Sequence, residues 1–112
     1  MSSDPPIFST IFDEYDLDSR SDVQVILDDF TRNWLPEKQQ EITDTFKKEQ
    51  WDSLNEILHV VKGAAGGYGY GLLTDLSKSI EDKIRAQEYD HLPQLISDLN
   101  IICSRIYAGN KP

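Results

Sequence analysis

The chain has 112 residues, of which 38% are hydrophobic and 28% are charged, proportions typical of one soluble globular domain with a single core. Its 20 acidic and 11 basic residues give a net charge of -9, which disfavours nucleic acid and anionic membrane surfaces as partners. The sequence also lacks a run of about 18 apolar residues that could cross a membrane, and its acidic N-terminus does not resemble a secretion signal.

A short helix is predicted near the N-terminus, over about residues 5–15. Asp4 is suited to be its N-cap because Pro5 follows, and proline is well tolerated in the first turn of a helix. Four apolar residues follow at helical spacing: Ile7, Phe8, Ile11 and Phe12. We expect this helix to belong to an N-terminal segment, residues 1–20, that packs against the rest of the domain.

A long second helix is predicted to begin near Ser21. Ser21 and Gln24 form the S-x-x-Q pattern of a capping box, and apolar residues follow at helical spacing. Pro36 would normally kink or end such a helix because proline removes one backbone hydrogen bond. The apolar phase nevertheless continues to Ile42 and Phe46, so we favour one bent helix to about residue 49 over two separate helices.

Three further helices complete the predicted fold. Asp52 or Ser53 can cap a third helix that runs to about residue 66, where glycines accumulate. The apolar stripes of the fourth and fifth helices are Leu72, Leu73, Leu76, Ile80 and Ile84, and Leu92, Leu95, Ile96, Leu99, Ile102, Cys103 and Ile106. The sequence therefore predicts a single all-α domain over residues 1–112. We expect an antiparallel up-down four-helix bundle at 21–107, a short additional N-terminal helix and a tail at 108–112.

His59 is the residue with the clearest candidate chemistry. On a helical wheel of residues 52–66 the apolar side chains centre almost opposite His59, so this histidine is predicted to face solvent. Its neighbours on the exposed side are Asn55, Glu56, Lys62, Gly63 and Gly66. A glycine inside a helix costs about 1 kcal/mol relative to alanine, so Gly63 and Gly66 suggest a surface kept bare for docking. We predict that Asn55, Glu56, Gly63 and Gly66 bind a partner.

An exposed imidazole can carry a phosphoryl group. Near pH 7 a neutral imidazole has a free ring nitrogen that can attack phosphorus, and the N–P bond is labile enough to pass the group onward. Lys62, one turn along, can place a positive charge near the phosphoryl oxygens. A lone histidine on a helix is more often an ordinary surface residue, and the glycine run at 66–71 matches neither nucleotide-binding glycine motif. We expect no kinase activity.

The segment from His59 to Gly69, HVVKGAAGGYG, with Leu73 four residues on, resembles the signature of the histidine-containing phosphotransfer (HPt) family. That signature is H-x-x-K-G-[AS]-x-x-x-x-G followed by a leucine. The likeness covers about residues 20–107 and includes Glu81 at the end of the pattern L-x-x-L-x-x-x-I-E. Tyr68 stands where the family commonly has a smaller aliphatic residue, and it could pack inward or contact a partner.

The resemblance implies a phosphorelay intermediate. His59 would accept a phosphoryl group from a receiver-domain aspartate, or through a histidine kinase pathway, and pass it to a response-regulator aspartate. Lys62 would support the phosphoryl group, and Gly63 would leave space for the receiver. The implied partners are receiver domains of response regulators and of a hybrid histidine kinase. No cofactor is expected on this chain, since Mg²⁺ would belong to the receiver, and we expect a monomer.

The main alternative is a helical adaptor that binds a receiver or kinase without carrying phosphate. His91, near the predicted start of the last helix, is interpreted as a surface or capping residue. Cys103 lies on an apolar stripe and is interpreted as a small core residue; alone, it cannot form an internal disulfide, which fits a reducing cytoplasm. Two histidines and one cysteine give no metal-ligand spacing. Trp34 and Trp51 are expected to be partly buried near helix ends.

Overall fold

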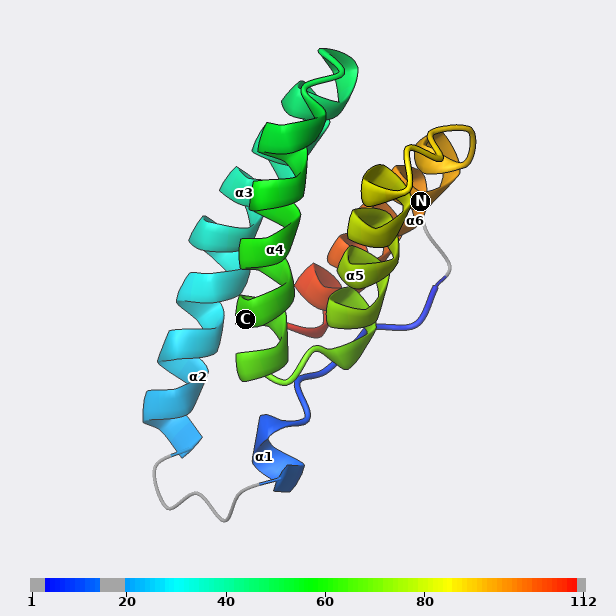
Figure 1. The fold of residues 1–112 in the computed structure, drawn as a ribbon. Coiled ribbons are helices and arrows are strands. Elements are labelled where there is room, and N and C mark those ends of the chain that lie inside the picture. The colour runs from blue at the N-terminus through cyan, green and yellow to red at the C-terminus, as the bar shows by residue number, and fades with distance from the viewer. Residues whose placement is uncertain (1–3, 15–19, 111–112) are drawn as a thin grey trace.

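Helices make up most of the described chain, which comprises residues 4–14 and 20–110 of the computed structural model, and no strand occurs in these ranges (Figure 1). In chain order the elements are α1 (Ile11–Glu14), α2 (Arg20–Asp29), the π-helical segment η1 (Phe30–Trp34), α3 (Leu35–Lys47), α4 (Trp51–Gly67), α5 (Gly71–Arg85) and α6 (Leu92–Gly109). The predicted all-α class is confirmed. Helix α6 continues through Gly109, into the segment expected to be a tail.

The N-terminal helix is much shorter than predicted. Residues 4–10 are not helical and α1 begins only at Ile11, so Asp4 does not cap a helix and the prediction for this segment was wrong. A tertiary hydrogen bond explains why this segment is not helical. The N–H of Ile7 donates to the carbonyl of Arg105 in α6 at 2.9 Å, which draws the segment out along another element instead of into a helical turn.

The segment 4–10 also reaches the turn between α4 and α5. The N–H of Thr10 donates to the carbonyl of Gly69 at 2.9 Å. Gly69 has a φ of +80°, and a Cβ at this position would lie 2.6 Å from Oγ of Ser9. Glycine is therefore required here both for the left-handed backbone and for the close approach of the N-terminal segment.

One continuous helix runs from α2 through η1 into α3, as favoured from the apolar phase. The residues at both junctions, Asp29 and Leu35, have right-handed helical dihedrals. Proline crowds the carbonyl four residues before it, and here the turn preceding Pro36 is a wider π turn in which the N–H of Leu35 donates to the carbonyl of Phe30. The helix thus passes the proline without ending. The side chain of Ser21 lies outside the described part, so the capping box stays a prediction.

Helix α4 starts two or three residues earlier than expected. Its first residue is Trp51, and the preceding residue, Gln50, makes no side-chain capping bond, so neither Asp52 nor Ser53 is the cap. The indole of Trp51 stacks on the ring of Tyr89 at 4.5 Å between centroids, with an interplanar angle of 12°. This packing holds Trp51 in the first turn. Both tryptophans are half-buried, as predicted, but Trp34 lies within the continuous helix and not near a helix end.

Helix α4 packs against α3 and α5, and α6 packs against α5 and α3 (Figure 1). Most of the predicted stripes are buried, but Leu72 is 52% exposed at the start of α5, which corrects its assignment to the core. Tyr68 packs inward, with its ring 4.5 Å from that of Phe30. The open question about this tyrosine is thereby answered in favour of packing.

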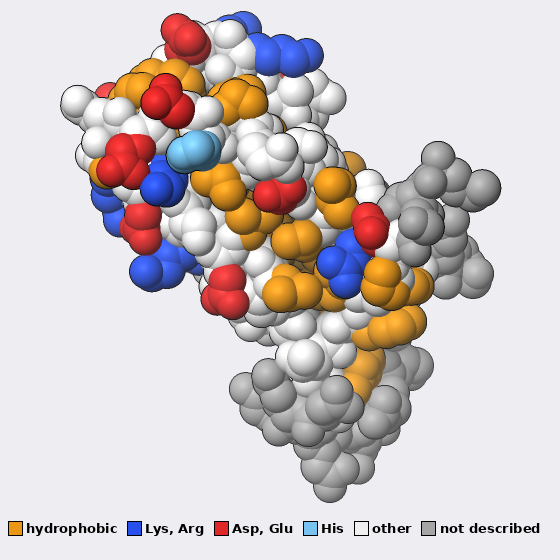
Figure 2. All heavy atoms as spheres, turned by 90° about the vertical axis from the view of Figure 1, so that its right-hand side faces the viewer, with side chains coloured by type: hydrophobic (Ala, Val, Ile, Leu, Met, Phe, Trp, Pro, Cys, Tyr) orange, Lys and Arg blue, Asp and Glu red, His pale blue; other side chains and the backbone are white. Residues whose placement is uncertain are grey.

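The side of the molecule on the right of Figure 1 has a mixed surface. Figure 2 shows hydrophobic side chains across this face, with lysine and arginine side chains scattered among acidic ones. None of the helices in the described ranges is long and apolar enough to span a membrane.

Candidate functional site

His59 lies in the middle of α4, on the side that faces away from the core. Its side chain is 68% exposed. The buried residues of the same helix are Leu54, Leu58, Val61 and Ala65. Since these lie on the opposite side of the helix, the solvent-facing position predicted from the wheel is confirmed, and a partner can reach the imidazole ring.

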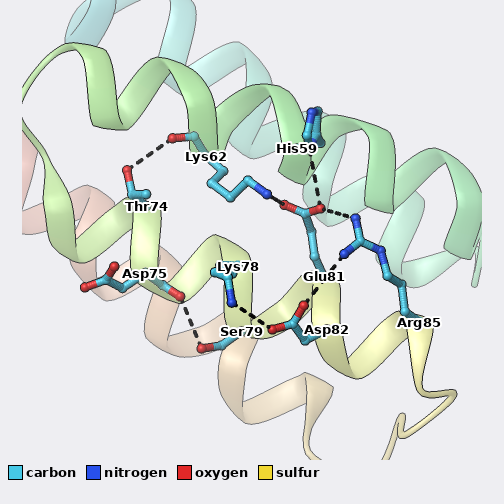
Figure 3. A network of polar contacts seen from close by, with 9 residues as sticks. All are labelled: His59, Lys62, Thr74, Asp75, Lys78, Ser79, Glu81, Asp82 and Arg85. Carbon is cyan, nitrogen blue, oxygen red and sulfur yellow. Dashed lines mark hydrogen bonds and ion pairs between the residues drawn. The ribbon is translucent and has the colours of Figure 1, made fainter.

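A carboxylate from the neighbouring helix α5 lies next to the imidazole (Figure 3). Glu81 is 1% exposed, and its Oε2 lies 3.6 Å from Nδ1 of His59. This distance exceeds that of a good hydrogen bond, so the contact is electrostatic and favours a proton on Nδ1. In that tautomer the lone pair is on Nε2, which is then the nitrogen available for nucleophilic attack.

Two cationic side chains compensate the buried charge of Glu81. Nζ of Lys62 lies 3.1 Å from Oε1, and a guanidinium nitrogen of Arg85 lies 3.0 Å from Oε2 (Figure 3). A buried carboxylate is costly unless it is paired, so these two contacts make its position tenable. The resulting cluster ties α4, which supplies His59 and Lys62, to α5, which supplies Glu81 and Arg85.

Lys62 is less open than the sequence suggested. Its side chain is 24% exposed, and its ammonium group lies between α4 and α5 against Glu81 (Figure 3). A second contact fixes the same turn of α4, because Oγ1 of Thr74 in α5 donates to the backbone carbonyl of Lys62 at 3.1 Å. Lys62 is therefore next to the histidine, but in the free chain its charge is directed to the buried carboxylate.

An open groove of about 560 Å³ runs beside His59. It is lined by Asp52, Asn55, Glu56, His59, Val60, Glu81 and Arg85. Two of the four predicted partner-binding residues, Asn55 and Glu56, thus share this groove with the histidine. Val60 adds an apolar side chain that is 51% exposed.

The two glycines predicted to bind a partner, Gly63 and Gly66, do not line the groove, and their surroundings differ. Gly63 faces open space, since a Cβ built there would meet nothing within 4 Å. At Gly66 a Cβ would lie 3.4 Å from Oγ1 of Thr74, so this glycine sits against α5. The structure therefore places Gly63 on a free surface next to His59 and Gly66 at the contact between two helices.

Sequence reasoning missed Glu81 and Arg85 as parts of the site. A signal was present, because Glu81 falls within the buried stripe of α5, next to Ile80 and one turn after Ser77. A carboxylate at a buried helical position predicts a cationic partner. Arg85, four residues later, is on the same side of the helix and is one such partner.

The family model for the Hpt domain matches residues 25–109 of this chain. The chain belongs to the Hpt family. Membership implies a role in histidine phosphotransfer in two-component signalling, in which Hpt domains interact with receiver domains and kinases. No curated protein and no solved structure matched the chain in the corresponding comparisons.

The other candidate residues of this Hpt domain lie in different surroundings. His91 is exposed at the N-cap position of α6 and makes no side-chain capping bond, so it is a surface residue. Cys103 is fully buried, and burial raises the pKa of its thiol to about 12, which keeps it protonated and unreactive. Within the described ranges, no group of three or more potential ligands could hold a metal ion.

Proposed function

We propose that this Hpt domain is a phosphorelay intermediate that carries a phosphoryl group on His59. It would accept the group from a receiver-domain aspartate, or through a histidine kinase pathway, and pass it to the aspartate of a response regulator. The observation that carries the proposal is an exposed imidazole beside an open groove, with a buried carboxylate 3.6 Å from Nδ1. This arrangement favours attack by Nε2.

In the forward step the lone pair of Nε2 forms an N–P bond while the bond between phosphorus and the aspartate oxygen breaks. The aspartate leaves as a carboxylate and keeps the electron pair of that bond. The imidazole, protonated on Nδ1, gains positive charge, which the nearby carboxylate of Glu81 stabilises. Transfer to a second aspartate is the reverse of this step. Mg²⁺ would be held by the receiver, and this chain would need no cofactor of its own.

Lys62 supports the phosphoryl group in this proposal by neutralising Glu81 directly beside it. Without that ammonium group, the uncompensated negative charge of Glu81 would lie close to the incoming phosphoryl oxygens and repel them. Arg85 is the other cation on the same carboxylate. The site is thus balanced so that the carboxylate can orient the ring without repelling the group that the ring accepts.

The receiver would dock on the exposed side of α4. Asn55 and Glu56 line the groove, Gly63 leaves the surface next to His59 bare, and Gly66 lets α5 lie close to the same helix. An antiparallel up-down arrangement of the four long helices, with α1 as an additional N-terminal helix, would leave this side of α4 and the groove beside His59 open to a receiver. We further propose a cytoplasmic monomer whose partners are receivers of response regulators and of a hybrid histidine kinase.

Phosphoryl transfer from a phosphorylated receiver domain tests the proposal. With Mg²⁺ present, the wild-type chain should gain an acid-labile phosphoryl group, and His59→Gln should gain none while its circular dichroism and melting temperature stay close to wild type. His91→Gln is the matched control and should be labelled normally. Binding of the receiver without any labelling of the wild-type chain would instead favour the adaptor function.

A further inference from the structure

The groove beside His59 has an uneven balance of charge. Of the residues that line it, Arg85 is the one lysine or arginine, whereas Asp52, Glu56 and Glu81 are acidic. A phosphoryl group on His59 would bring roughly two further negative charges to this place. A cationic donor that reaches this group from the groove would stabilise it.

Arg85 is positioned to be that donor. One of its nitrogens lies 3.0 Å from Oε2 of Glu81, the same oxygen that Nδ1 of His59 approaches at 3.6 Å. The guanidinium and the imidazole are therefore neighbours on one carboxylate oxygen, and Figure 3 shows them meeting it from different sides. Arg85 is the last residue of α5, and its side chain is 61% exposed, so little packing restrains its movement.

The present partners of Arg85 can release it. Its contact with Asp82, at 3.7 Å, joins two side chains that are 61% and 53% exposed, and such surface pairs are weak. Glu81 would keep a partner if Arg85 turned away, because Lys62 remains 3.1 Å from the other carboxylate oxygen. The guanidinium can therefore leave without stranding a buried charge.

Lys62 is less suited to hold the phosphoryl group directly. It does not line the groove, and its 24% exposed side chain is directed between the helices to Glu81. An arginine also presents several N–H donors in a planar fork that matches two phosphoryl oxygens, which an ammonium group cannot do. Exposure, location and donor geometry all favour Arg85 over Lys62.

We propose that Arg85 binds the phosphoryl group carried by His59. On phosphorylation its guanidinium turns from Asp82 and Glu81 to donate to phosphoryl oxygens, while Lys62 keeps Glu81 neutralised. The inference rests on the proposed function, because it requires His59 to be phosphorylated. It adds a phosphoryl-binding residue that the histidine signature does not contain.

A chemical phosphoryl donor tests this without any partner protein. The chain is phosphorylated with phosphoramidate, and the phosphohistidine signal is followed by ³¹P NMR as a function of pH. In wild type the guanidinium stabilises the doubly charged phosphoryl group, so in Arg85→Gln the pKa of that group should rise by at least about half a pH unit. Arg85→Lys should give an intermediate value, because it keeps the charge and loses the fork.

Lys78→Gln is the matched control. Lys78 also lies on α5, pairs with Asp82 at 3.5 Å and is 66% exposed, but it does not line the groove. Its removal changes the net charge by the same amount and should leave the ³¹P titration at the wild-type value. If circular dichroism shows that Arg85→Gln has lost helix, the comparison of wild type with Arg85→Lys decides.

The outcomes separate the inference from the proposed function. If His59 is labelled but the Arg85 variants titrate like Lys78→Gln, Arg85 does not bind the phosphoryl group and the relay function still stands. If neither phosphoramidate nor a phosphorylated receiver labels His59 in wild type, both proposals are wrong.

Discussion

Helix α4 has two interfaces that are built from different kinds of side chain. Toward η1 and α3 the contacts are aromatic at both ends: the ring of Tyr68 lies 4.5 Å from Phe30, and that of Trp51 lies 6.2 Å from Phe46. Toward α5 the contacts around Glu81 are ionic. The first interface packs α4 against η1 and α3, and the second places a buried carboxylate beside His59. Variants on the two sides should therefore affect stability and phosphoryl transfer in different proportions.

The largest loss of stability is expected on the aromatic side. Phe30 is 3% exposed and stacks with Trp34, Tyr68 and Tyr70. Phe30→Ala should lower the free energy of unfolding by about 3–5 kcal/mol, because it leaves a cavity among these rings. Urea denaturation measures this, and the folded fraction should still transfer phosphate at the wild-type rate.

Val25→Ala provides the control for Phe30→Ala. Val25 is 67% exposed on α2, so its truncation should change the unfolding free energy by less than about 0.5 kcal/mol. A loss below about 1 kcal/mol for Phe30→Ala would show that the aromatic interface does not hold α4 in place.

On the ionic side, transfer should suffer more than stability. Glu81→Gln keeps the size of the side chain but removes the charge that orients His59, so transfer from a phosphorylated receiver should slow by about tenfold or more. The unfolding free energy should fall by only about 1–3 kcal/mol, because Lys62 and Arg85 can turn toward solvent once the carboxylate is gone. Stopped-flow transfer and urea denaturation give the two numbers.

Asp82→Asn is the comparison for Glu81→Gln. Asp82 also contacts Arg85, at 3.7 Å, but it is 53% exposed and has no contact with the histidine. The Asp82→Asn variant should transfer the phosphoryl group at the wild-type rate. Equal rates for wild type and Glu81→Gln would mean that the carboxylate serves only to join the two helices.

Lys62→Ala should have a graded effect. Loss of the ammonium group leaves part of the charge of Glu81 uncompensated beside the phosphoryl group, and transfer should slow roughly 5- to 30-fold. Lys78→Ala removes the same charge from an exposed position on α5 and should not slow transfer. An unchanged rate in Lys62→Ala would make this lysine a bystander.

A small gain in stability is expected at Gly63. A side chain there meets nothing within 4 Å, so Gly63→Gln should raise the unfolding free energy by about 0.5–1 kcal/mol through better helix propensity. The same side chain projects from the surface next to His59 and should hold a receiver away, which slows transfer.

Gly67→Gln separates these two effects. A Cβ at Gly67 also meets open space, but this position lies two turns beyond His59 at the end of α4. Gly67→Gln should therefore leave the rate of phosphoryl transfer unchanged. A Gly63→Gln chain that is destabilised and still transfers normally would show that this glycine serves packing and that the proposed docking surface is misplaced.

The sequence predicted features that depend on one helix alone. The exposure of His59 followed from the period of the apolar residues in α4, and the passage of the long helix through Pro36 followed from an uninterrupted apolar phase. The π turn that accommodates the proline was not predicted, because a one-residue change in helical winding leaves no distinct pattern over so short a segment.

Features that depend on other elements were missed. The segment 4–10 has helical spacing, but its bonds to Arg105 and Gly69 hold it outside a helix. The proximity of Glu81 and Arg85 to His59 depends on the packing of α5 on α4, which the apolar stripe of a single helix does not reveal. Local periodicity therefore predicted the exposed position of the histidine, and tertiary contacts determine which side chains surround it.

In the proposed relay, Glu81 holds the Nδ1–H tautomer of His59, so that phosphorylation occurs on Nε2. Two-dimensional ¹H–¹⁵N NMR of the imidazole, recorded before and after labelling by a phosphorylated receiver, measures both properties. We expect a proton on Nδ1 in the free chain and phosphorus bonded to Nε2 in the labelled chain. Phosphorus bonded to Nδ1, or a label on His91, would contradict it.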